Sequence, residues 1–215
     1  AVFCLYNEVM EVYVMDVSPL RGREREALER LSAERREKAL RLRREEAHLL
    51  SIGAGLLLRM AGLEPPFAFG EHGKPYLPGG PAFSLTHTGT FAALAVQENR
   101  VGLDAETIAP VRRAAARALT SGERRFMEAE PERRFTYLWT RKEAVLKCTG
   151  AGLSAAMNAF SVLDDTAALG GETFSLYTVE YGNILLSAAV TAGSAAFFPQ
   201  TVEASELLQE AARWN

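Results

Sequence analysis

The spacing of apolar residues changes from strand-like to helical and back over the first hundred positions. Residues 9–17 are rich in β-branched and aromatic side chains, which predicts a strand. Residues 21–44 are helical and densely charged, and residues 45–61 predict a buried helix because their apolar side chains recur at mixed three- and four-residue spacing. Turn-forming residues dominate 62–81, so we expect a loop region there. Residues 82–96 predict two short strands around a Thr-Gly-Thr turn.

The same order of elements returns in the second hundred positions. Thr120 and Glu123 stand at the spacing of a capping box, which predicts the start of a helix. A longer helix is expected to stop at Gly150, because glycine suits the left-handed turn that closes a helix. The remaining expected elements are a strand at 101–106, the long helix at about 131–149, strands at 174–181 and 183–190, the segment 197–205, and a C-terminal helix containing Leu207, Leu208 and Trp214. The sequence thus predicts two α+β halves that meet near Arg100, without a repeat of fixed period.

Composition excludes several classes of protein. The 215 residues are 48% hydrophobic and 24% charged, an ordinary globular balance. A formal net charge of -3 gives no overall field that would attract nucleic acid or an acidic membrane. Cys4 and Cys148 form neither a disulfide framework nor a metal-binding spacing, which favours a reducing compartment. The longest apolar run is interrupted by Arg59 and is too short to span a bilayer, so we expect a cytoplasmic protein.

Residues 21–44 carry a local excess of positive charge. Ten basic residues stand against five acidic ones, so the segment is about +5 within a chain that is net negative. Two interpretations are open: a solvated pair of helices with i,i+4 ion pairs, or a site for a polyanion. Nucleic acid is disfavoured as that polyanion, because no recognised binding motif is present and the pI is about 5.8.

Two carboxylates share one face of the strand expected at 101–106. Alternation of side chains puts Gly102, Asp104 and Glu106 together on this face and apolar residues on the other. The Cα atoms of Asp104 and Glu106 would lie about 6.6 Å apart, so the two side chains can converge on one cation. The face is either an outward polar surface or part of a Mg²⁺ site, in which the phosphates of a substrate supply further ligands.

Lysine is rare in this chain, and its positions are therefore informative. Of the 24 residues that are Lys or Arg, the lysines are Lys38, Lys74, Lys142 and Lys147. Trp139, Glu143 and Lys147 form one stripe of the long helix, in which Glu143 and Lys147 could simply make an exposed ion pair of about 0.3–0.5 kcal/mol. Unlike arginine, however, lysine can lose a proton or approach a phosphate end-on, so these positions are candidates for catalysis.

Four motifs stand in order along the chain: GKPYL, FSLTHTG, VGLDAE and WTRKEAVLKCTGAGLS. Together with LSAERREKALRLRREEAHLL, they resemble the Sfp-type (surfactin-synthetase-activating) 4′-phosphopantetheinyl transferases. The resemblance implies an α+β pseudo-dimer of two similar halves, each a small, mainly antiparallel sheet packed with helices, with the active site between them. The N-terminal half, 1–99, would bind the nucleotide of coenzyme A (CoA). The C-terminal half, 100–215, would carry the metal and the catalytic residues.

The resemblance also implies a reaction. Enzymes of this family transfer the 4′-phosphopantetheine arm of CoA to a serine of an apo acyl or peptidyl carrier protein and release 3′,5′-ADP. This holo-[acyl-carrier-protein] synthase type of activity serves fatty-acid, polyketide or nonribosomal peptide biosynthesis. We therefore expect a monomer that uses Mg²⁺ or Mn²⁺ and that has CoA and a carrier protein as partners. The alternative is a non-catalytic module that binds CoA or a carrier protein, but a pure binder has no need of the full set of acidic residues and lysines.

The matching motifs assign roles to individual residues. The implied metal ligands are Asp104, Glu106 and Glu143. The implied catalytic residues are Glu143, which is the base unless a water on the metal takes that role, and Lys147, which meets the leaving phosphate. The implied CoA contacts are Arg35, Lys38, Gly73, Lys74, Pro75, Thr86, His87, Lys142 and Lys147, with Arg35 and Lys38 at the 3′-phosphate. Glu123 is a further candidate base, although helix capping is a sufficient structural reason for it. The chain departs from the family at Leu49, where an arginine for the 3′-phosphate is common.

Overall fold

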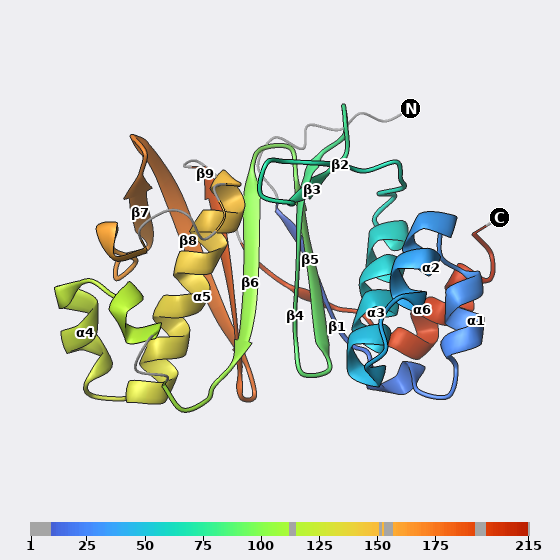
Figure 1. Ribbon diagram of the computed structural model, residues 1–215, viewed down its shortest axis with the longest axis horizontal. Helices are drawn as coiled ribbons and strands as arrows, with labels where there is room; N and C mark the ends of the chain where they lie inside the picture. Colours follow the sequence, from blue (N-terminus) through green and yellow to red (C-terminus); the bar gives the residue numbers. More distant parts are fainter. Residues whose placement is uncertain (1–9, 112–114, 151, 153–156, 192–196, 215) are drawn as a thin grey trace.

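Two sheets with helices on their outer faces make up the computed structural model, which describes residues 10–111, 115–150, 152, 157–191 and 197–214 (Figure 1). The strands are β1 (Glu11–Asp16), β2 (Ala68–Phe69), β3 (Pro75–Tyr76), β4 (Ala82–Thr88), β5 (Phe91–Gln97), β6 (Val101–Thr107), β7 (Thr166–Leu169), β8 (Glu172–Tyr181), β9 (Ile184–Thr191) and β10 (Gln200–Thr201). The α-helices are α1 (Glu24–Glu29), α2 (Ala33–Leu40), α3 (Glu45–Met60), α4 (Ser121–Met127), α5 (Pro131–Thr149) and α6 (Ala204–Ala211). Short 3-10 helices cover Ser18–Leu20, Ala115–Ala118 and Met157–Ala159.

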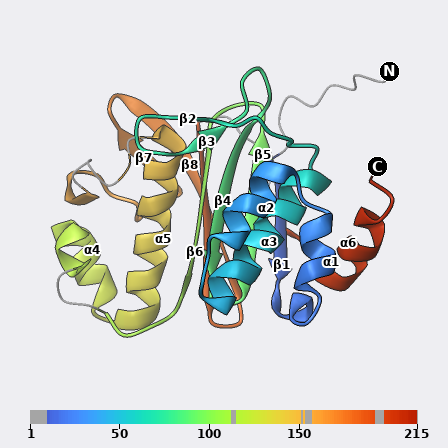
Figure 2. The same ribbon diagram turned by 45° about the vertical axis from the view of Figure 1, so that its right-hand side comes forward.

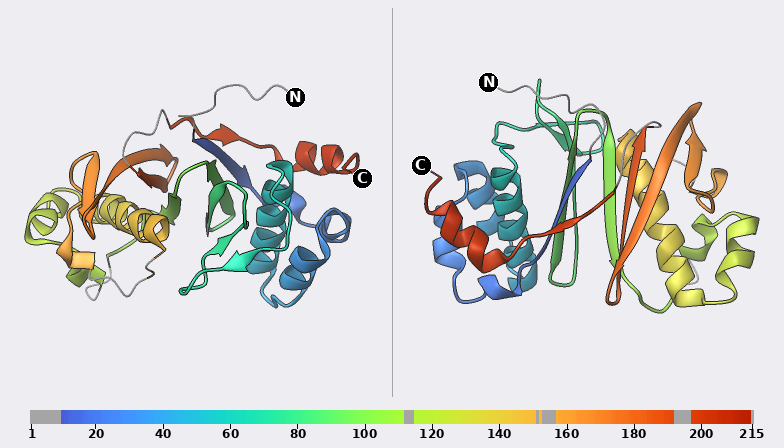
Figure 3. Two further views of the ribbon diagram at one scale, coloured as in Figure 1. Left: turned by 90° about the horizontal axis from the view of Figure 1, so that it is seen from above. Right: turned by 180° about the vertical axis from the view of Figure 1, so that it is seen from behind.

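The strands form two four-stranded sheets and a separate hairpin. The first sheet has the order β10-β1-β5-β4, the second has the order β6-β9-β8-β7, and β2 pairs with β3. All neighbouring strands are antiparallel except β1 and β10, which are parallel. Helices α1, α2, α3 and α6 lie on one side of the molecule, and α5 covers the second sheet on the other side, with α4 beside it (Figures 1 and 3). The expected α+β fold with mainly antiparallel sheets packed with helices is confirmed.

Helix α3 forms the centre of the first half. Its apolar side chains, among them Leu49, Ile52 and Leu56, are buried in one cluster with residues of β1, β5 and α6. Each such side chain contributes roughly 1.5–3 kcal/mol by leaving water. The neighbouring helix α2 begins at a cap, because the Ser32 side chain accepts a hydrogen bond from the backbone N–H of Arg35. Of the basic side chains of α2, Arg35 and Lys38 line a cavity, whereas Arg36 donates to the backbone oxygen of Leu28.

Helix α5 lies unusually close to β6 in the second half. A Cβ atom added at Gly102 would lie 2.0 Å from the backbone oxygen of Ala144, so only glycine permits this approach. The helix starts with Pro131 at its first turn and ends at Gly150, whose φ of 74° closes it in the left-handed conformation. Gly102 shares its strand face with Asp104, and the close packing therefore brings that carboxylate against α5.

A row of hydroxyl groups joins the two halves along β4 and β6. The side chains of Ser84, Thr86 and Thr88 accept hydrogen bonds from backbone N–H groups of β6, at distances of 3.0, 3.1 and 3.3 Å. The donors belong to Leu103, Ala105 and Thr107. Because β6 is the edge strand of its sheet, these largely buried groups would otherwise lack partners. Apolar residues of β1, β5, β6 and β9 pack beside this row in a shared cluster.

Three details differ from the sequence expectations or add to them. The stretch 62–81, expected as loop, contains the β2–β3 hairpin. Strand β10 pairs with β1, and α6 packs against α3, so the end of the chain returns to the first half (Figure 3). We therefore propose two halves, 1–99 and 100–215, in which residues 200–211 pack with the first half although they follow the second in the chain. Among the described residues no helix is long and apolar enough to cross a membrane, and Cys4 lies outside them.

Candidate active site

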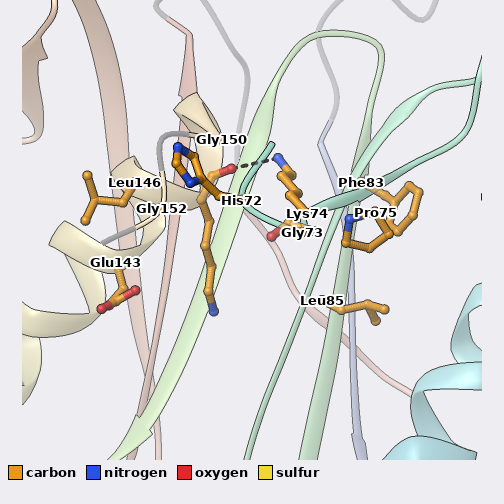
Figure 4. A pocket seen from close by; sticks show the side chains of 12 residues that line it. His72, Gly73, Lys74, Pro75, Phe83, Leu85, Glu143, Leu146, Gly150 and Gly152 are labelled. Atoms are coloured by element: carbon orange, nitrogen blue, oxygen red, sulfur yellow. Dashed lines mark hydrogen bonds between the residues drawn. The ribbon is translucent and has the colours of Figure 1, made fainter. Parts of the chain in front are cut away.

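Two cavities adjoin near the boundary between the halves: the first is lined from both halves, and the second by residues of the first half. The first, of about 240 Å³, lies between the β2–β3 hairpin, β4 and α5 (Figure 4). It is lined by His72, Gly73, Lys74, Pro75, Phe83, Ser84, Leu85, Glu143, Leu146, Lys147, Gly150 and Gly152. The second is lined in part by Arg35 and Lys38 and shares Pro75, Phe83 and Leu85 with the first. We call the two together the cleft; it extends from α2, across β4, to α5.

Asp104 and Lys147 form an ion pair at the α5 side of the cleft. The Nζ atom of Lys147 lies 2.6 Å from Oδ1 of Asp104 and 3.1 Å from the backbone oxygen of Leu103. Asp104 is only 5% exposed. Burial raises the pKa of its carboxyl group above the ordinary value, and the charge of Lys147 opposes that rise. Its second oxygen, Oδ2, is buried and has no hydrogen-bond partner.

Glu106 and Glu143 share the environment of Asp104. Burial and then the charge of Asp104 raise the pKa of Glu106, and the same two causes raise the pKa of Glu143 to about 7. The charge of Glu106 adds to the rise at Glu143. Lys147 acts on all three carboxyl groups and lowers their pKa values. The structure therefore brings together the four residues expected at the metal and catalytic centre, although they come from two separate segments.

These carboxylates fit a divalent cation chemically without forming a closed cage for it. The unpartnered Oδ2 of Asp104 offers a buried oxygen ligand, and carboxylate oxygens are what Mg²⁺ prefers. Across the described ranges, no three His, Cys, Asp or Glu side chains are arranged to hold a metal ion by themselves. A site of this kind takes further ligands from water and from substrate phosphates. The set of Asp104, Glu106 and Glu143 as ligands stays a prediction.

Basic side chains of the first half face the cleft from the other side. Arg35 is largely buried, donates from Nη2 to the backbone oxygen of Ser51 at 3.1 Å, and leaves Nε without a partner. Burial and then the charge of Arg35 lower the pKa of Lys38. Burial and then the charge of Lys147 lower the pKa of His87, with Lys38 adding to the effect. Lys38, His87 and Lys147, from α2, β4 and α5, thus share one electrostatic environment.

The hairpin and β4 place the other expected CoA contacts. Gly73 takes a φ of 79° between β2 and β3, which glycine adopts without strain, and it lines the cleft together with Lys74 and Pro75. Thr86 is buried, and its hydroxyl group is engaged by the backbone of Ala105 at the seam. A contact from Thr86 to CoA stays a prediction; its visible role is to join the two halves.

Lys142 differs from the expectation that it contacts CoA. Its side chain is fully buried in the second half, and its Nζ atom lies 3.0 Å from Oε2 of Glu123. The same ammonium donates to the backbone oxygens of Met157 and Phe160 at 2.7 and 2.5 Å. Glu123 also accepts the backbone N–H groups of Thr120 and Val162, at 2.7 and 2.9 Å. Both side chains are buried in the core and neither lines the cleft, so the structure shows the capping role of Glu123, and a role as base stays a prediction.

Several residues of the cleft were not expected from the sequence. Phe83 and Leu85 line both cavities, and alternation along β4 could have found them, because they share a strand face with His87. His72 received no role from its motif, yet it lines the cleft beside Gly152. No sequence motif around His72 predicts that it lines the cleft, because its position there depends on how the β2–β3 hairpin folds.

Comparison with known proteins agrees with this geometry. The family model described as "4'-phosphopantetheinyl transferase superfamily" matches residues 100–181, which include the acidic strand and α5. A 4'-phosphopantetheinyl transferase of Bacillus subtilis is 34% identical over 171 residues, which cover 71% of this chain and 76% of the relative. The 4'-phosphopantetheinyl transferase AcpT of Salmonella typhi is 44% identical over a region that covers 46% of this chain and 56% of AcpT. The 4'-phosphopantetheinyl transferase Sfp of Bacillus subtilis (strain 168) is 30% identical over a region that covers 61% of this chain and 66% of Sfp. On this sequence likeness, the chain belongs to the 4′-phosphopantetheinyl transferase family.

Proposed function

We propose that this chain transfers the 4′-phosphopantetheine arm of CoA to a serine of an apo acyl or peptidyl carrier protein, releasing 3′,5′-ADP. The observation that carries the proposal is the cleft itself. A carboxylate with a pKa near 7 and a lysine line it, the lysine pairs with a buried carboxylate that has an unpartnered oxygen, and basic side chains lie opposite. Phosphoryl transfer needs this combination of positioning and charge neutralisation more than it needs covalent chemistry.

The nucleotide end of CoA belongs at the first half in this proposal. Arg35 and Lys38 supply positive charge for the 3′-phosphate from α2, and His87 supplies a polar group from β4. The hairpin residues Gly73 to Pro75 lie alongside the nucleotide, and Phe83 and Leu85 offer apolar contact. This arrangement leaves the diphosphate of CoA to reach toward α5.

The reacting groups belong at the second half. The serine oxygen of the carrier forms a bond to the phosphorus atom that bears the pantetheine arm, while the bond from that phosphorus to the oxygen of 3′,5′-ADP breaks. Glu143 takes the serine proton, since its carboxyl group lines the cleft next to Lys147 on α5. Lys147 turns from Asp104 to the leaving phosphate and neutralises the charge that develops there. Asp104, Glu106 and Glu143 would hold Mg²⁺ or Mn²⁺, whose chemistry is to neutralise the diphosphate.

The reaction is testable by the mass of its product. A panel of apo acyl and peptidyl carrier proteins is incubated with the chain, CoA and Mg²⁺, and the intact carriers are weighed by mass spectrometry. We expect at least one carrier to gain the mass of the phosphopantetheine arm, with 3′,5′-ADP released in equal amount. Binding of CoA without any mass gain across the panel would contradict the proposal and favour the alternative, a non-catalytic CoA- or carrier-binding module.

We also propose that the chain acts as a monomer in the cytoplasm. The monomer is what the resemblance to the Sfp-type transferases implies. Within the described ranges Cys148 is a free, buried thiol, and a free thiol is compatible with a reducing compartment. Size-exclusion chromatography with light scattering tests the monomer: a mass of about 23.5 kDa supports it, and a stable dimer contradicts it.

A further inference from the structure

The ammonium group of Lys74 crosses from the first half to the second. Its Nζ atom donates to the backbone oxygen of Val101 at 2.8 Å. It also donates to the backbone oxygen of Lys147 at 2.7 Å, the hydrogen bond drawn as a dashed line in Figure 4. Val101 begins β6, the strand that carries Asp104, and Lys147 lies in the last turn of α5. Figure 2 shows the hairpin that bears Lys74 extending across the top of the molecule toward α5. One side chain thus connects the hairpin, β6 and α5.

The end of α5 needs such a donor. The last carbonyl groups of an α-helix have no partner within the helix. The backbone oxygen of Leu146 receives the N–H of Gly150 at 3.0 Å, and the next oxygen along the chain, that of Lys147, receives the ammonium of Lys74. The helix dipole favours a cation at this end. Lys74 therefore adds, from the first half, a further partner to the end of α5 that Gly150 closes.

A lysine suits position 74 better than an arginine, because its ammonium group must donate to two different elements. Lys74 is partly buried, and burial lowers its pKa, with further lowering by the charges of Arg100 and Lys147. An ammonium group has three donors that can point to acceptors on different elements, and two of them are used here on β6 and α5. A planar guanidinium fork directs its donors in one fixed pattern. The geometry accounts for a lysine at this position in a chain that otherwise favours arginine.

We propose that Lys74 is a positioning residue, which fixes α5 against β6 and thereby holds Lys147 beside Asp104. The two interactions meet on one residue: the backbone oxygen of Lys147 accepts from Lys74 at 2.7 Å, and its side chain pairs with Asp104 at 2.6 Å. This role differs from a contact between the ammonium and the CoA nucleotide. The effect of Lys74 on catalysis rests on the proposed function. Its role in fixing α5 against β6 does not depend on that function.

Steady-state kinetics separate the two roles. Lys74→Met keeps the apolar stem and removes the ammonium, Lys74→Arg keeps the charge, and Glu71→Gln changes an exposed charge on the same hairpin as a control. We expect Lys74→Met to lower kcat for carrier loading at least about tenfold, the size of losing one hydrogen bond to a charged group. The KM for CoA should change less than kcat, Lys74→Arg should restore less than half of the loss, and Glu71→Gln should match the wild type. An unchanged kcat with a raised KM for CoA would overturn the proposal, since that pattern belongs to a substrate contact.

Hydrogen exchange provides a readout that needs no activity. In the ligand-free protein, Lys74→Met should speed amide exchange in the hairpin, 68–76, and at the end of α5, near Gly150, while Glu71→Gln leaves both unchanged. Exchange at the wild-type rate in both segments of Lys74→Met would overturn the proposal, whatever the kinetics. A wild-type chain that loads no carrier would instead remove the proposed function and leave the exchange result standing. The two failures are therefore distinguishable.

Discussion

Two lysine–carboxylate pairs lie on different sides of helix α5, and only one of them faces the cleft. Lys142 and Glu123 are both completely buried, and every donor of the ammonium and both oxygens of the carboxylate have partners. The Lys147 side chain is 32% exposed and lines the cavity, and its partner Asp104 keeps one oxygen without a hydrogen bond.

The difference between the pairs separates a structural role from a chemical one. A pair whose hydrogen bonds are all satisfied has nothing left to offer a substrate, and it stabilises one arrangement of the core. A pair at a cavity, with a free oxygen and other carboxylates near it, can exchange its internal partner for a ligand. Similar residue types on the same helix thus serve two purposes, and their surroundings decide which.

The largest effect on stability is expected from breaking the buried pair. Lys142→Met leaves Glu123 charged and without its partner in the core, so the free energy of unfolding should fall by about 3–5 kcal/mol. Replacing both residues, as Lys142→Met with Glu123→Leu, should cost less than the single change, because no uncompensated charge remains. Urea unfolding measures both. A single variant as stable as the wild type would show that the pair is not structural.

A smaller loss is expected from separating α5 and β6. Gly102→Ala puts a Cβ atom 2.0 Å from the backbone of Ala144, and overpacking of this kind costs about 1–3 kcal/mol. The displaced helix should also carry Glu143 and Lys147 away from Asp104, so carrier loading should fall as well. Gly122→Ala is the matched control, since its Cβ would meet its nearest neighbour at 3.5 Å. Equal stability and activity of the two variants would mean that close packing at Gly102 does not position the site.

The smallest effect is expected at the far end of the cleft. Lys38→Ala removes one positive charge from α2 without touching α5, so affinity should fall about tenfold for CoA and little for dephospho-CoA. Isothermal titration with the two ligands measures the ratio of their dissociation constants. A ratio equal to that of the wild type would remove the assignment of the 3′-phosphate to Lys38.

Local sequence patterns predicted the parts of the site that depend on one element. Alternation along β6 placed Asp104 with Glu106 and Gly102, and the helical repeat placed Glu143 one turn before Lys147. The bounds of α5 followed from Pro131 and Gly150, which act through local backbone geometry. These features need no knowledge of the rest of the fold.

Contacts between distant segments could not be read in the same way. Lys142 and Lys147 lie about 140° apart around the helix, but the sequence does not say which side meets the cleft. The two-residue strands β2 and β3 are too short to show a period. One of the hydrogen bonds of Lys74 depends on Lys147, which comes 73 residues later in the chain. The return of α6 to α3 likewise depends on tertiary packing.

The most direct test compares Glu143→Gln with Glu123→Gln in carrier loading, below the melting temperature of both variants. Both changes replace one carboxylate by an amide, one in the cleft and the other in the core beside Lys142. Intact-mass spectrometry of the carrier over time should show no phosphopantetheine gained with Glu143→Gln, and near wild-type gain with Glu123→Gln. Loading at the wild-type rate by a folded Glu143→Gln variant would contradict the assignment of the chemistry to this cleft.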